Sequence, residues 1–302
     1  MGRKVLIAGE SWTVHSIHQK GFDSFTTTEY AEGVGWLRGA LEAGGWDVTY
    51  QPAHVAARDF PFDAQALSAY DCVMLSDIGS NTLLLHPDTF VRSRALPDRL
   101  EAIRDYVLGG GGFVMIGGYM TFQGIDAKAR YRDTAVAEVL PVEMQPGDDR
   151  CEKPQGITPV VRDSGHPIVA GLAGEWPDLL GYNRFAAAPQ GVVVASVGED
   201  PLIVAGSFGA GRSVAFASDC GPHWAPPAFV GWSGYAPLWC QIAGGAQWGP
   251  QSEAKATERP APQGVVVASV GEDPLIVAGS FGAGRSVAFA SDCGPHWAPP
   301  AI

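Results

Sequence analysis

The fold class is decided by the stretch GFVMIGGY, residues 112–119. Its first five residues form an unbroken apolar run, and two glycines then mark a tight turn. Such a run is typical of a strand that is buried on both faces of a sheet. The residues before it, 97–108, predict a helix, because proline stands at the start and Gly109-Gly110 follow the end. Helix, buried strand and tight turn in succession indicate a parallel α/β sheet.

The same alternation continues on both sides of this stretch. A helix is predicted at 29–44, where Leu37, Ala40 and Leu41 share one face. The late strands follow one another without helices, so the sheet gains an antiparallel extension. We therefore expect an α/β domain with a mostly parallel sheet, helices on both faces and an antiparallel edge. The predicted strands are residues 4–8, 46–50, 72–77, 112–117, 192–197, 202–207 and 213–217.

An internal duplication determines the predicted domain boundaries. Residues 188–228 recur without one substitution as residues 261–301. Repeat architectures have three or more divergent copies, so two identical copies indicate a recent duplication or a gene-assembly artefact. Residues 250–260 are polar and bounded by proline, which predicts a linker. We expect a working domain at residues 1–249 and a surplus tail at 261–302. The alternative is that the second copy displaces the first from the sheet, since identical strands fit equally well.

Composition restricts the partners and the compartment. The net charge is −12, and the five cysteines show no CxxC spacing. An acidic chain without a basic stripe repels phosphate backbones, so nucleic-acid binding is not expected. No apolar run approaches the roughly 18 residues that cross a bilayer, and the first run ends at Gly9-Glu10, too early for a signal peptide. We expect a cytoplasmic protein with reduced thiols and no membrane partner, with a homo-oligomer as an open alternative.

Polar and aromatic side chains follow four of the predicted strands. In an open α/β sheet, ligands bind beyond the carboxyl ends of the strands, so these side chains predict a site for a small-molecule ligand. The site is expected to hold four catalytic groups and a set of substrate-binding groups. The catalytic candidates are His223, Asp219, Tyr119 and Glu10, and the substrate-binding candidates are Ser11, Trp12, His15, Asp77, Asn81, Gln123 and Trp224.

The motifs at these strand ends resemble those of the class I glutamine amidotransferase-like superfamily. Within it, the chain is similar to a family of cytoplasmic proteins near the trehalose-utilisation-type proteins, over about residues 4–248. The resemblance implies a flavodoxin-like sheet but no particular reaction. It is carried by residues 9–12, 76–79, 117–124 and 218–224, which read GESW, SDIG, GGYMTFQG and SDCGPHW.

The chain departs from that superfamily at the tight turn. The resemblance implies a nucleophilic cysteine there, in a Gly-x-Cys-x-Gly setting, but Tyr119 and Thr121 stand at the matching positions. A phenol with an unperturbed pKa of about 10 is a poor nucleophile for an amide. His223 occupies a place comparable to that of the superfamily's partner histidine, but Ala225 stands where its carboxylate companion is usual. Glutamine hydrolysis of the ordinary kind is therefore not expected.

Alternative chemistries remain open at the same strand ends. Cys220 and His223 form a Cys-x-x-His pair, although a small buried cysteine at a strand end is the simpler interpretation. Ser11 beside Glu10 is more typical of a helix cap than of an activated nucleophile. We expect no cofactor, and a divalent metal is the less favoured alternative. Its candidate ligands are Glu10, His15, His18, Asp77, Asp219 and His223.

The aromatic residues leave two interpretations of the ligand. Aromatic faces beside carboxylates and amides suit a sugar ring, but they also suit a plain hydrophobic cap over the sheet. The first hypothesis is a protein that lacks the cysteine and binds or processes a small polar, carbohydrate-like substrate. The second is a non-catalytic sensor or interaction subunit that keeps the fold only. The aromatic residues concerned are Trp12, Phe22, Phe25, Tyr119, Phe122 and Trp224.

Overall fold

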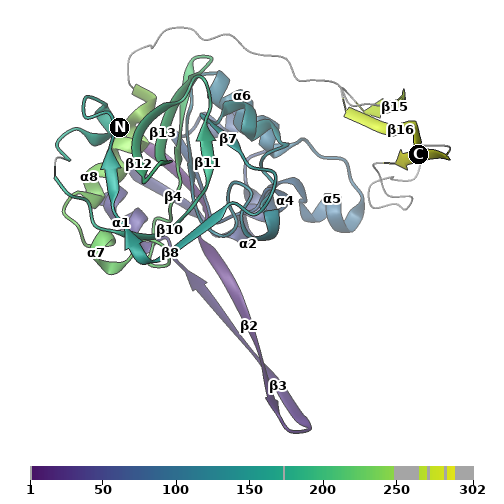
Figure 1. Ribbon diagram of the computed structural model, residues 1–302, viewed down its shortest axis with the longest axis horizontal. Coiled ribbons are helices and arrows are strands. Elements are labelled where there is room, and N and C mark those ends of the chain that lie inside the picture. The colour runs from purple at the N-terminus through teal and green to yellow at the C-terminus, as the bar shows by residue number, and fades with distance from the viewer. Residues whose placement is uncertain (1, 173, 248–264, 271–272, 282–283, 290–302) are drawn as a thin grey trace. The chain divides into compact units, whose positions relative to one another are not determined.

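The computed structural model describes residues 2–172, 174–247, 265–270, 273–281 and 284–289 (Figure 1). The chain divides into two compact units, which are described separately. The first contains Met1–Leu85 and Pro97–Gln251, and the second contains His86–Leu96 and Ser252–Ile302. In the described residues, no helix combines the length and the apolar character that spanning a membrane requires.

An eight-stranded sheet forms the centre of the first unit. Five neighbouring strands are parallel, and three further strands continue the sheet in antiparallel pairing. This confirms the predicted α/β class, with a mostly parallel sheet and an antiparallel extension. In order across the sheet, the strands are β4 (Asp47–Gln51), β1 (Lys4–Gly9), β5 (Cys72–Ser76), β6 (Gly112–Ile116), β14 (Gly211–Phe216), β13 (Asp200–Phe208), β12 (Val192–Val197) and β9 (Pro159–Val161).

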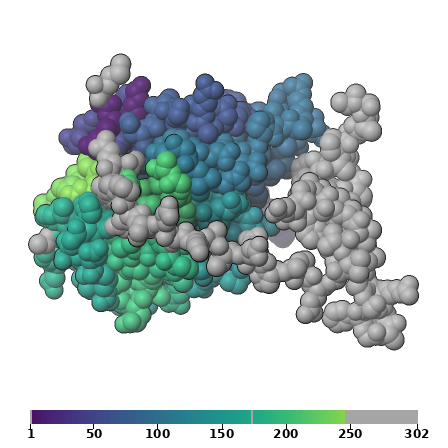
Figure 2. Space-filling view, turned by 90° about the horizontal axis from the view of Figure 1, so that it is seen from above, coloured from purple at the N-terminus to yellow at the C-terminus, as the bar shows by residue number. Residues whose placement is uncertain are grey.

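The core lies on both faces of this sheet. Every residue of β5 and β6 is buried, as the continuous apolar runs predict. Helices α1 (Gly35–Ala43) and α8 (Tyr235–Ala243) pack together, so the two ends of the unit's sequence lie side by side (Figure 2). A second group of packed helices consists of α2 (Ala53–Asp59), α3 (Ala64–Leu67), α4 (Ser80–Leu84) and α6 (Arg99–Leu108).

Shorter elements complete the first unit beside the extension. Two small antiparallel sheets pair β7 (Val142–Met144) with β11 (Phe185–Ala187), and β8 (Arg150–Ile157) with β10 (Leu179–Asn183). The remaining helical turns are α7 (Pro227–Val230), η1 (Ile125–Ala127), η2 (Ala135–Val139), η3 (Pro167–Val169) and η4 (Gly244–Gln247).

The helix predicted at residues 29–44 is wrong in its first part. Residues up to Glu32 belong to β3 (Asp23–Glu32), which pairs with β2 (Ser11–Lys20), and α1 begins only at Gly35. Gly21, at φ 62°, lies in the two-residue turn between these strands. Together they form a long hairpin that projects away from the sheet (Figure 1). The physical reason is pairing: β3 has a strand of equal length directly before it, and this pairing overrides a modest helical pattern.

The second unit contains a short helix and a second antiparallel sheet. The helix is α5 (Pro87–Arg92), and the strands are β15 (Val265–Val270), β16 (Asp273–Phe281) and β17 (Gly284–Phe289). These strands repeat the register of β12–β14. The first copy, β12–β14, pairs within the eight-stranded sheet. That residues 261–302 are a surplus tail stays a prediction, and the linker predicted at 250–260 lies outside the described residues.

Candidate functional site

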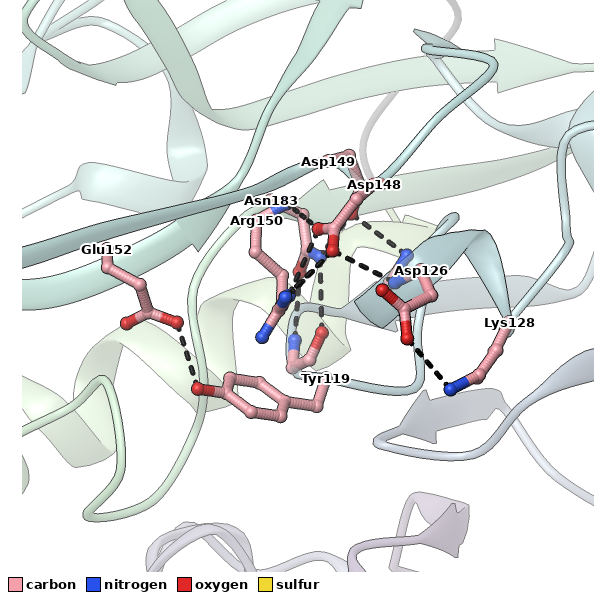
Figure 3. Close-up of polar contacts among 10 residues, drawn as sticks. Tyr119, Asp126, Lys128, Asp148, Asp149, Arg150, Glu152 and Asn183 are labelled. Carbon is pink, nitrogen blue, oxygen red and sulfur yellow. Dashed lines mark hydrogen bonds and ion pairs between the residues drawn. The ribbon is translucent and has the colours of Figure 1, made fainter.

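A buried hydrogen-bond network holds the tight turn after β6. At Gly117, a Cβ atom would lie 2.2 Å from the carbonyl oxygen of Ala217, so only glycine fits this close approach. The amide of Gly118 donates to Asn183 Oδ1 at 2.9 Å, and Asn183 Nδ2 donates back to the Gly118 carbonyl at 3.1 Å. The same Nδ2 also donates to Asp149 Oδ1 at 2.8 Å (Figure 3). The turn is therefore fixed from outside, by a residue of β10.

Tyr119 directs its hydroxyl toward a carboxylate. The hydroxyl donates to Glu152 Oε1 at 2.9 Å (Figure 3). The second oxygen of Glu152 accepts from Trp224 Nε1 at 2.9 Å. The guanidinium carbon of Arg150 lies 4.7 Å from the centre of the Tyr119 ring. Partial burial and the hydrogen bond to Glu152 raise the pKa of Tyr119. The phenol is therefore a neutral hydrogen-bond donor near neutral pH.

His223 and Asp219 form an ion pair at the end of β14. The distance from His223 Nδ1 to Asp219 Oδ2 is 3.5 Å, and the His223 side chain is 47% exposed whereas that of Asp219 is 7% exposed. Asp219 is fixed in turn, because its Oδ1 accepts from the Gly221 amide at 3.0 Å. The interaction with Asp219 raises the pKa of His223 against the opposing effect of burial. The imidazole ring lies 4.5 Å from the Tyr119 ring in an edge-to-face arrangement.

Two carboxylates lie at the ends of β1 and β5. Glu10 and Asp77 have positive φ angles of 50° and 44°, which non-glycine residues adopt rarely. Glu10 is buried, and its Oε2 accepts from the Ser76 hydroxyl at 2.5 Å. Burial and then the charges of Asp219 and Asp77 raise the pKa of Glu10 well above its usual value. Burial and then Asp219 raise the pKa of Asp77 to about 6.

A metal ion could find three ligand atoms within this cluster. One side-chain atom each from Glu10, Asp219 and Cys220 lies within 4.8 Å of the others, and all three residues are buried. A carboxylate pair with one thiol is a plausible ligand set for a divalent transition metal. The hydrogen bond from Ser76 and the raised pKa values also describe a cluster that shares protons without a metal. That no metal is required therefore stays a prediction.

The structure brings most of the predicted residues together, but it removes others. Glu10, Asp77, Tyr119, Asp219 and His223 lie within electrostatic or ring contact of one another, with Trp224 buried beside Tyr119.

The hairpin carries predicted residues away from this cluster. His15 pairs with Thr28 along the hairpin, and its Nδ1 lies 3.0 Å from the Thr28 hydroxyl. His18 likewise contacts Thr27 at 3.1 Å. Trp12, at the base of the hairpin, is 43% exposed and stays near the cluster: a Cβ atom added at Gly33 would lie 3.2 Å from Trp12 Cζ3 and 2.4 Å from Glu10 Oε1. The spacing of His15 and His18 therefore follows a strand, not a helix face that would bind a metal.

The last three candidates have local structural contacts. The Ser11 hydroxyl accepts from the Ala53 amide at 2.8 Å and so ties the base of the hairpin to α2. Gln123 is buried, and its Oε1 accepts from the Arg132 amide at 3.0 Å. Asn81 is exposed in the first turn of α4. Their predicted roles in substrate binding stay predictions.

Sequence reasoning missed the contribution of β8 and β10. Glu152 and Asn183 complete the surroundings of Tyr119 and Gly118, although they come from strands far away in the sequence. The one local signal was the charged run Asp148-Asp149-Arg150, which leads into β8. A charged run is usually a solvated surface, so this signal does not distinguish a site.

A separate pocket lies at the opposite end of the sheet. Its volume is about 350 Å³, and four of its lining residues directly precede strands: Arg3, Trp46, Asp71 and Gly111. It therefore opens at the amino ends of β1, β4, β5 and β6, away from the carboxylate cluster. In open α/β sheets the carboxyl ends are the usual ligand side, so the cluster remains the candidate site.

The sequence of the chain identifies its family. It matches the family described as putative glutamine amidotransferase (GATase1_like) over residues 4–248, and a second time over residues 245–302. The chain belongs to this family. In this family member Tyr119 stands at the turn after β6, and the absence of a nucleophilic cysteine from its site stays a prediction.

The chain is also similar to several solved structures. Two proteins from Salmonella typhimurium, described as cytoplasmic proteins STM3548 and STM1381, are 47% and 49% identical to the chain. Both have a TM-score of 0.77, and each match covers 80% of this chain and 97% or 98% of the other. A ThuA-like protein from Parabacteroides merdae is 14% identical, with a TM-score of 0.49, 82% of this chain and 90% of that one covered. Among curated proteins, none matches the chain.

Proposed function

We propose that this family member binds and processes a small polar molecule at the carboxyl ends of β1, β5, β6 and β14. The proposal is carried by one observation: the His223 imidazole is half exposed, yet a buried carboxylate, Asp219, holds it. A histidine that is oriented by a carboxylate and still open to solvent is suited to transfer protons to and from a ligand.

The roles of the neighbouring groups follow from their contacts. Asp219 orients the imidazole through Nδ1, and no partner of Nε2 is found among the described residues, which leaves that nitrogen for a ligand. Tyr119 offers a neutral hydroxyl close to the same ring, and Glu152 holds that hydroxyl in place. Glu10, with its raised pKa, is suited to donate a hydrogen bond to a ligand as a neutral carboxylic acid. This set supports acid–base chemistry on hydroxyl-rich, carbohydrate-like molecules.

Cysteine-dependent amide hydrolysis is not part of the proposal. Cys220 is the thiol closest in sequence to His223, but it is fully buried, and burial raises the pKa of its thiol well above the usual value. A thiol that keeps its proton is a poor nucleophile. Its contacts, with the Ser76 hydroxyl at 3.6 Å and with Glu10, fit a packed residue of the cluster.

A ligand screen tests the site. The melting temperature of the full chain and that of its His223→Ala variant would be measured with sugars, polyols, amino acids and divalent metals. We expect stabilisation by at least one hydroxyl-rich compound, with a tenfold or greater loss of affinity in the variant. His54→Ala is the matched control, because His54 is an exposed histidine on α2. Equal affinity in both variants, or binding that only Asp105→Asn in the amino-end pocket abolishes, would contradict the proposal.

A second candidate is a sensor that binds the same ligand without turnover. It is favoured by Tyr119, because the tight turn presents a hydroxyl that is already bonded to Glu152 and is no nucleophile. Product analysis by mass spectrometry separates the two candidates: a stabilising ligand that stays intact after prolonged incubation supports the sensor. Glutamate release from glutamine, measured in parallel, is expected to be absent in both cases.

The compartment, the partners and the need for a cofactor are also matters of proposal. The two Salmonella proteins are described as cytoplasmic, and we propose the same compartment for this chain. The small molecule is the proposed partner, no nucleic acid is proposed because the net charge is −12, and no cofactor is proposed.

A further inference from the structure

One oxygen of the buried Glu10 carboxyl group has no donor. Its Oε2 accepts from the Ser76 hydroxyl, whereas no N–H or O–H group of the described residues donates to Oε1. Glu10 is 3% exposed, and Oε1 is not among the sealed polar atoms without a partner in the described residues. A buried acceptor without a donor is costly, so Oε1 is suited to accept a hydrogen bond from a ligand.

Hydrogen bonds of the backbone fix the position of Glu10. Its amide donates to the Ser76 carbonyl at 2.7 Å, and its own carbonyl accepts from the Gly33 amide at 2.9 Å. The Tyr50 hydroxyl donates to the same carbonyl at 3.3 Å. These bonds hold the uncommon backbone conformation of Glu10 and therefore the direction of its side chain.

Two glycines border Oε1. A Cβ atom added at Gly33 would lie 2.4 Å from Oε1, and one added at Gly221 would lie 3.9 Å from it. Neither glycine has a positive φ angle, so backbone conformation does not demand glycine at these positions. The absent side chains instead keep the surroundings of Oε1 clear. The Gly221 amide also donates to Asp219, which places these surroundings next to the carboxylate that holds His223.

Two exposed tryptophan rings lie beside these glycines. The Cβ atom at Gly33 would lie 3.2 Å from Trp12 Cζ3, and the one at Gly221 would lie 3.9 Å from Trp36 Cε3. Trp12 is 43% exposed and Trp36 is 46% exposed. Among aromatic side chains, the indole ring attracts a cation most strongly, because its face carries partial negative charge.

The charges around Glu10 also favour a cation. The charged groups that act most strongly on its carboxyl group are Asp219 and Asp77, which are both acids. A bound cation would reduce the repulsion among these three groups and would lower the pKa of Glu10, so that its carboxyl group ionises. The neutral acid of the free protein then becomes the carboxylate partner of the cation.

We infer that the ligand of this site carries a primary ammonium group, which donates a hydrogen bond to Glu10 Oε1 beside the rings of Trp12 and Trp36. The inference rests on the proposed function, since it names a group on the ligand that the same site binds. A metal ion fits less well, because indole rings offer it no ligand atom. A quaternary ammonium has no N–H donor for Oε1. An amine with several hydroxyl groups, such as an amino sugar, suits the whole site.

Pairs of compounds that differ in one group test the charge. Glucosamine is compared with glucose, and ethanolamine with ethylene glycol, because each amine has a hydroxyl partner of similar size. Affinities for the full chain at pH 7 come from the dependence of the melting temperature on ligand concentration. At least one amine is expected to bind tenfold or more tightly than its hydroxyl partner. Glu10→Gln is expected to abolish this preference.

Two glycine variants test the place. Gly33→Ala puts a methyl group against Oε1 and is expected to weaken binding of the amine tenfold or more. Gly35→Ala is the matched control and is expected to leave it unchanged, since nothing lies within 4 Å of that Cβ position and φ is not positive. Melting temperatures without ligand verify that both variants fold. Should Gly33→Ala fail to fold, Trp36→Leu replaces it, because Trp36 is exposed and lies beside the same oxygen.

Other outcomes separate this inference from the proposed function. Hydroxyl compounds that bind as tightly as their amine partners would overturn the inference and leave the proposed function in place. Binding of neither amine, or stabilisation by Mn²⁺ or Zn²⁺ alone, would also overturn it. Equal losses in Gly33→Ala and Gly35→Ala would place the amine elsewhere. Amine binding that Glu10→Gln abolishes and His223→Ala leaves unchanged would support the ammonium site and contradict the proposed proton transfer.

Discussion

Asp77 shows how a single residue at the strand ends combines strain with charge. Its φ of 44° is uncommon for a non-glycine residue, and its Oδ1 accepts from the Met120 amide at 2.7 Å. The hydrogen bond favours the ionised form, but burial and the neighbouring Asp219 outweigh it and raise the pKa of Asp77 to about 6. The residue is retained at a cost to stability, which is typical of functional sites.

The raised pKa of Asp77 predicts a particular dependence of stability on pH. Between the unfolded pKa of about 3.9 and the folded pKa of about 6, the native state binds more protons than the unfolded state. The free energy of unfolding therefore falls as pH rises through this window. Asp77→Asn keeps the acceptor oxygen and removes the charge, so it is expected to raise stability at pH 7.5 by about 1–2 kcal/mol.

Urea denaturation of both proteins at several pH values between 4 and 8 measures this effect. The variant is expected to lose part of the slope between pH 4 and 6. The control is Asp47→Asn, an exposed aspartate on β4. A variant that is less stable than the wild-type protein at pH 7.5 would show that the ionised carboxylate is the stabilising form.

At the scale of elements, the Arg99 side chain connects helix α6 to helices α2 and α4. It opens α6 and is 1% exposed. Its guanidinium donates to carbonyl oxygens in or beside α2 and α4, and it lies over the Phe62 ring at 5.1 Å. Burial lowers the pKa of Arg99 to about 10, which leaves the side chain charged at neutral pH. The four acceptors are the carbonyl oxygens of Leu83 at 2.6 Å, Ala56 at 3.0 Å, Ala57 at 3.0 Å and Thr82 at 3.3 Å.

Replacing Arg99 is expected to cost more than replacing a surface arginine. Arg99→Met keeps much of the volume but leaves buried carbonyl oxygens without donors, at a cost of about 3–5 kcal/mol. Arg38→Met removes an exposed pair with Glu42 in α1, which water screens, and is expected to leave the stability nearly unchanged. Thermal denaturation of the two variants provides the comparison, and similar losses would mean that water replaces the Arg99 donors.

At the scale of the whole molecule, the two copies of the duplicated segment pair with different strands. Identical residues form β12–β14 within the eight-stranded sheet and β15–β17 in the second unit, with the same register. In the first copy, β14 pairs with β6, and β12 pairs with β9. In the second, the described strands pair only among themselves. The identical sequences therefore take different partners because of their different neighbours in the chain.

Truncation tests whether the tail is needed. Removing residues 250–302 is expected to leave a soluble protein with a melting temperature within about 3 °C of the full chain, because all eight strands of the sheet precede residue 217. An insoluble product would show that the tail is structural. The matched control removes residues 188–228 instead, which deletes β12–β14 and leaves the second copy to replace them. A folded control protein would demonstrate that the copies are interchangeable.

The sequence by itself determined the elements that are buried and continuous in the chain. The apolar runs of β5 and β6 are recognisable because burial on both faces demands a nearly continuous apolar stretch. It also identified the strand ends that carry Tyr119 and His223, since the carboxyl ends of parallel strands meet at one edge of the sheet.

Only the tertiary structure decided what each residue at those strand ends contacts. The hydrogen bond between Tyr119 and Glu152 joins the turn after β6 to strand β8, and no local pattern specifies such a contact. The hairpin was missed because its two exposed faces mix threonine with apolar and charged residues, so no hydrophobic period is present. Its formation takes His15 away from the carboxylates that the sequence places nearby. Periodicity records whether a side chain is buried, whereas the identity of its partner depends on how distant segments of the chain come together.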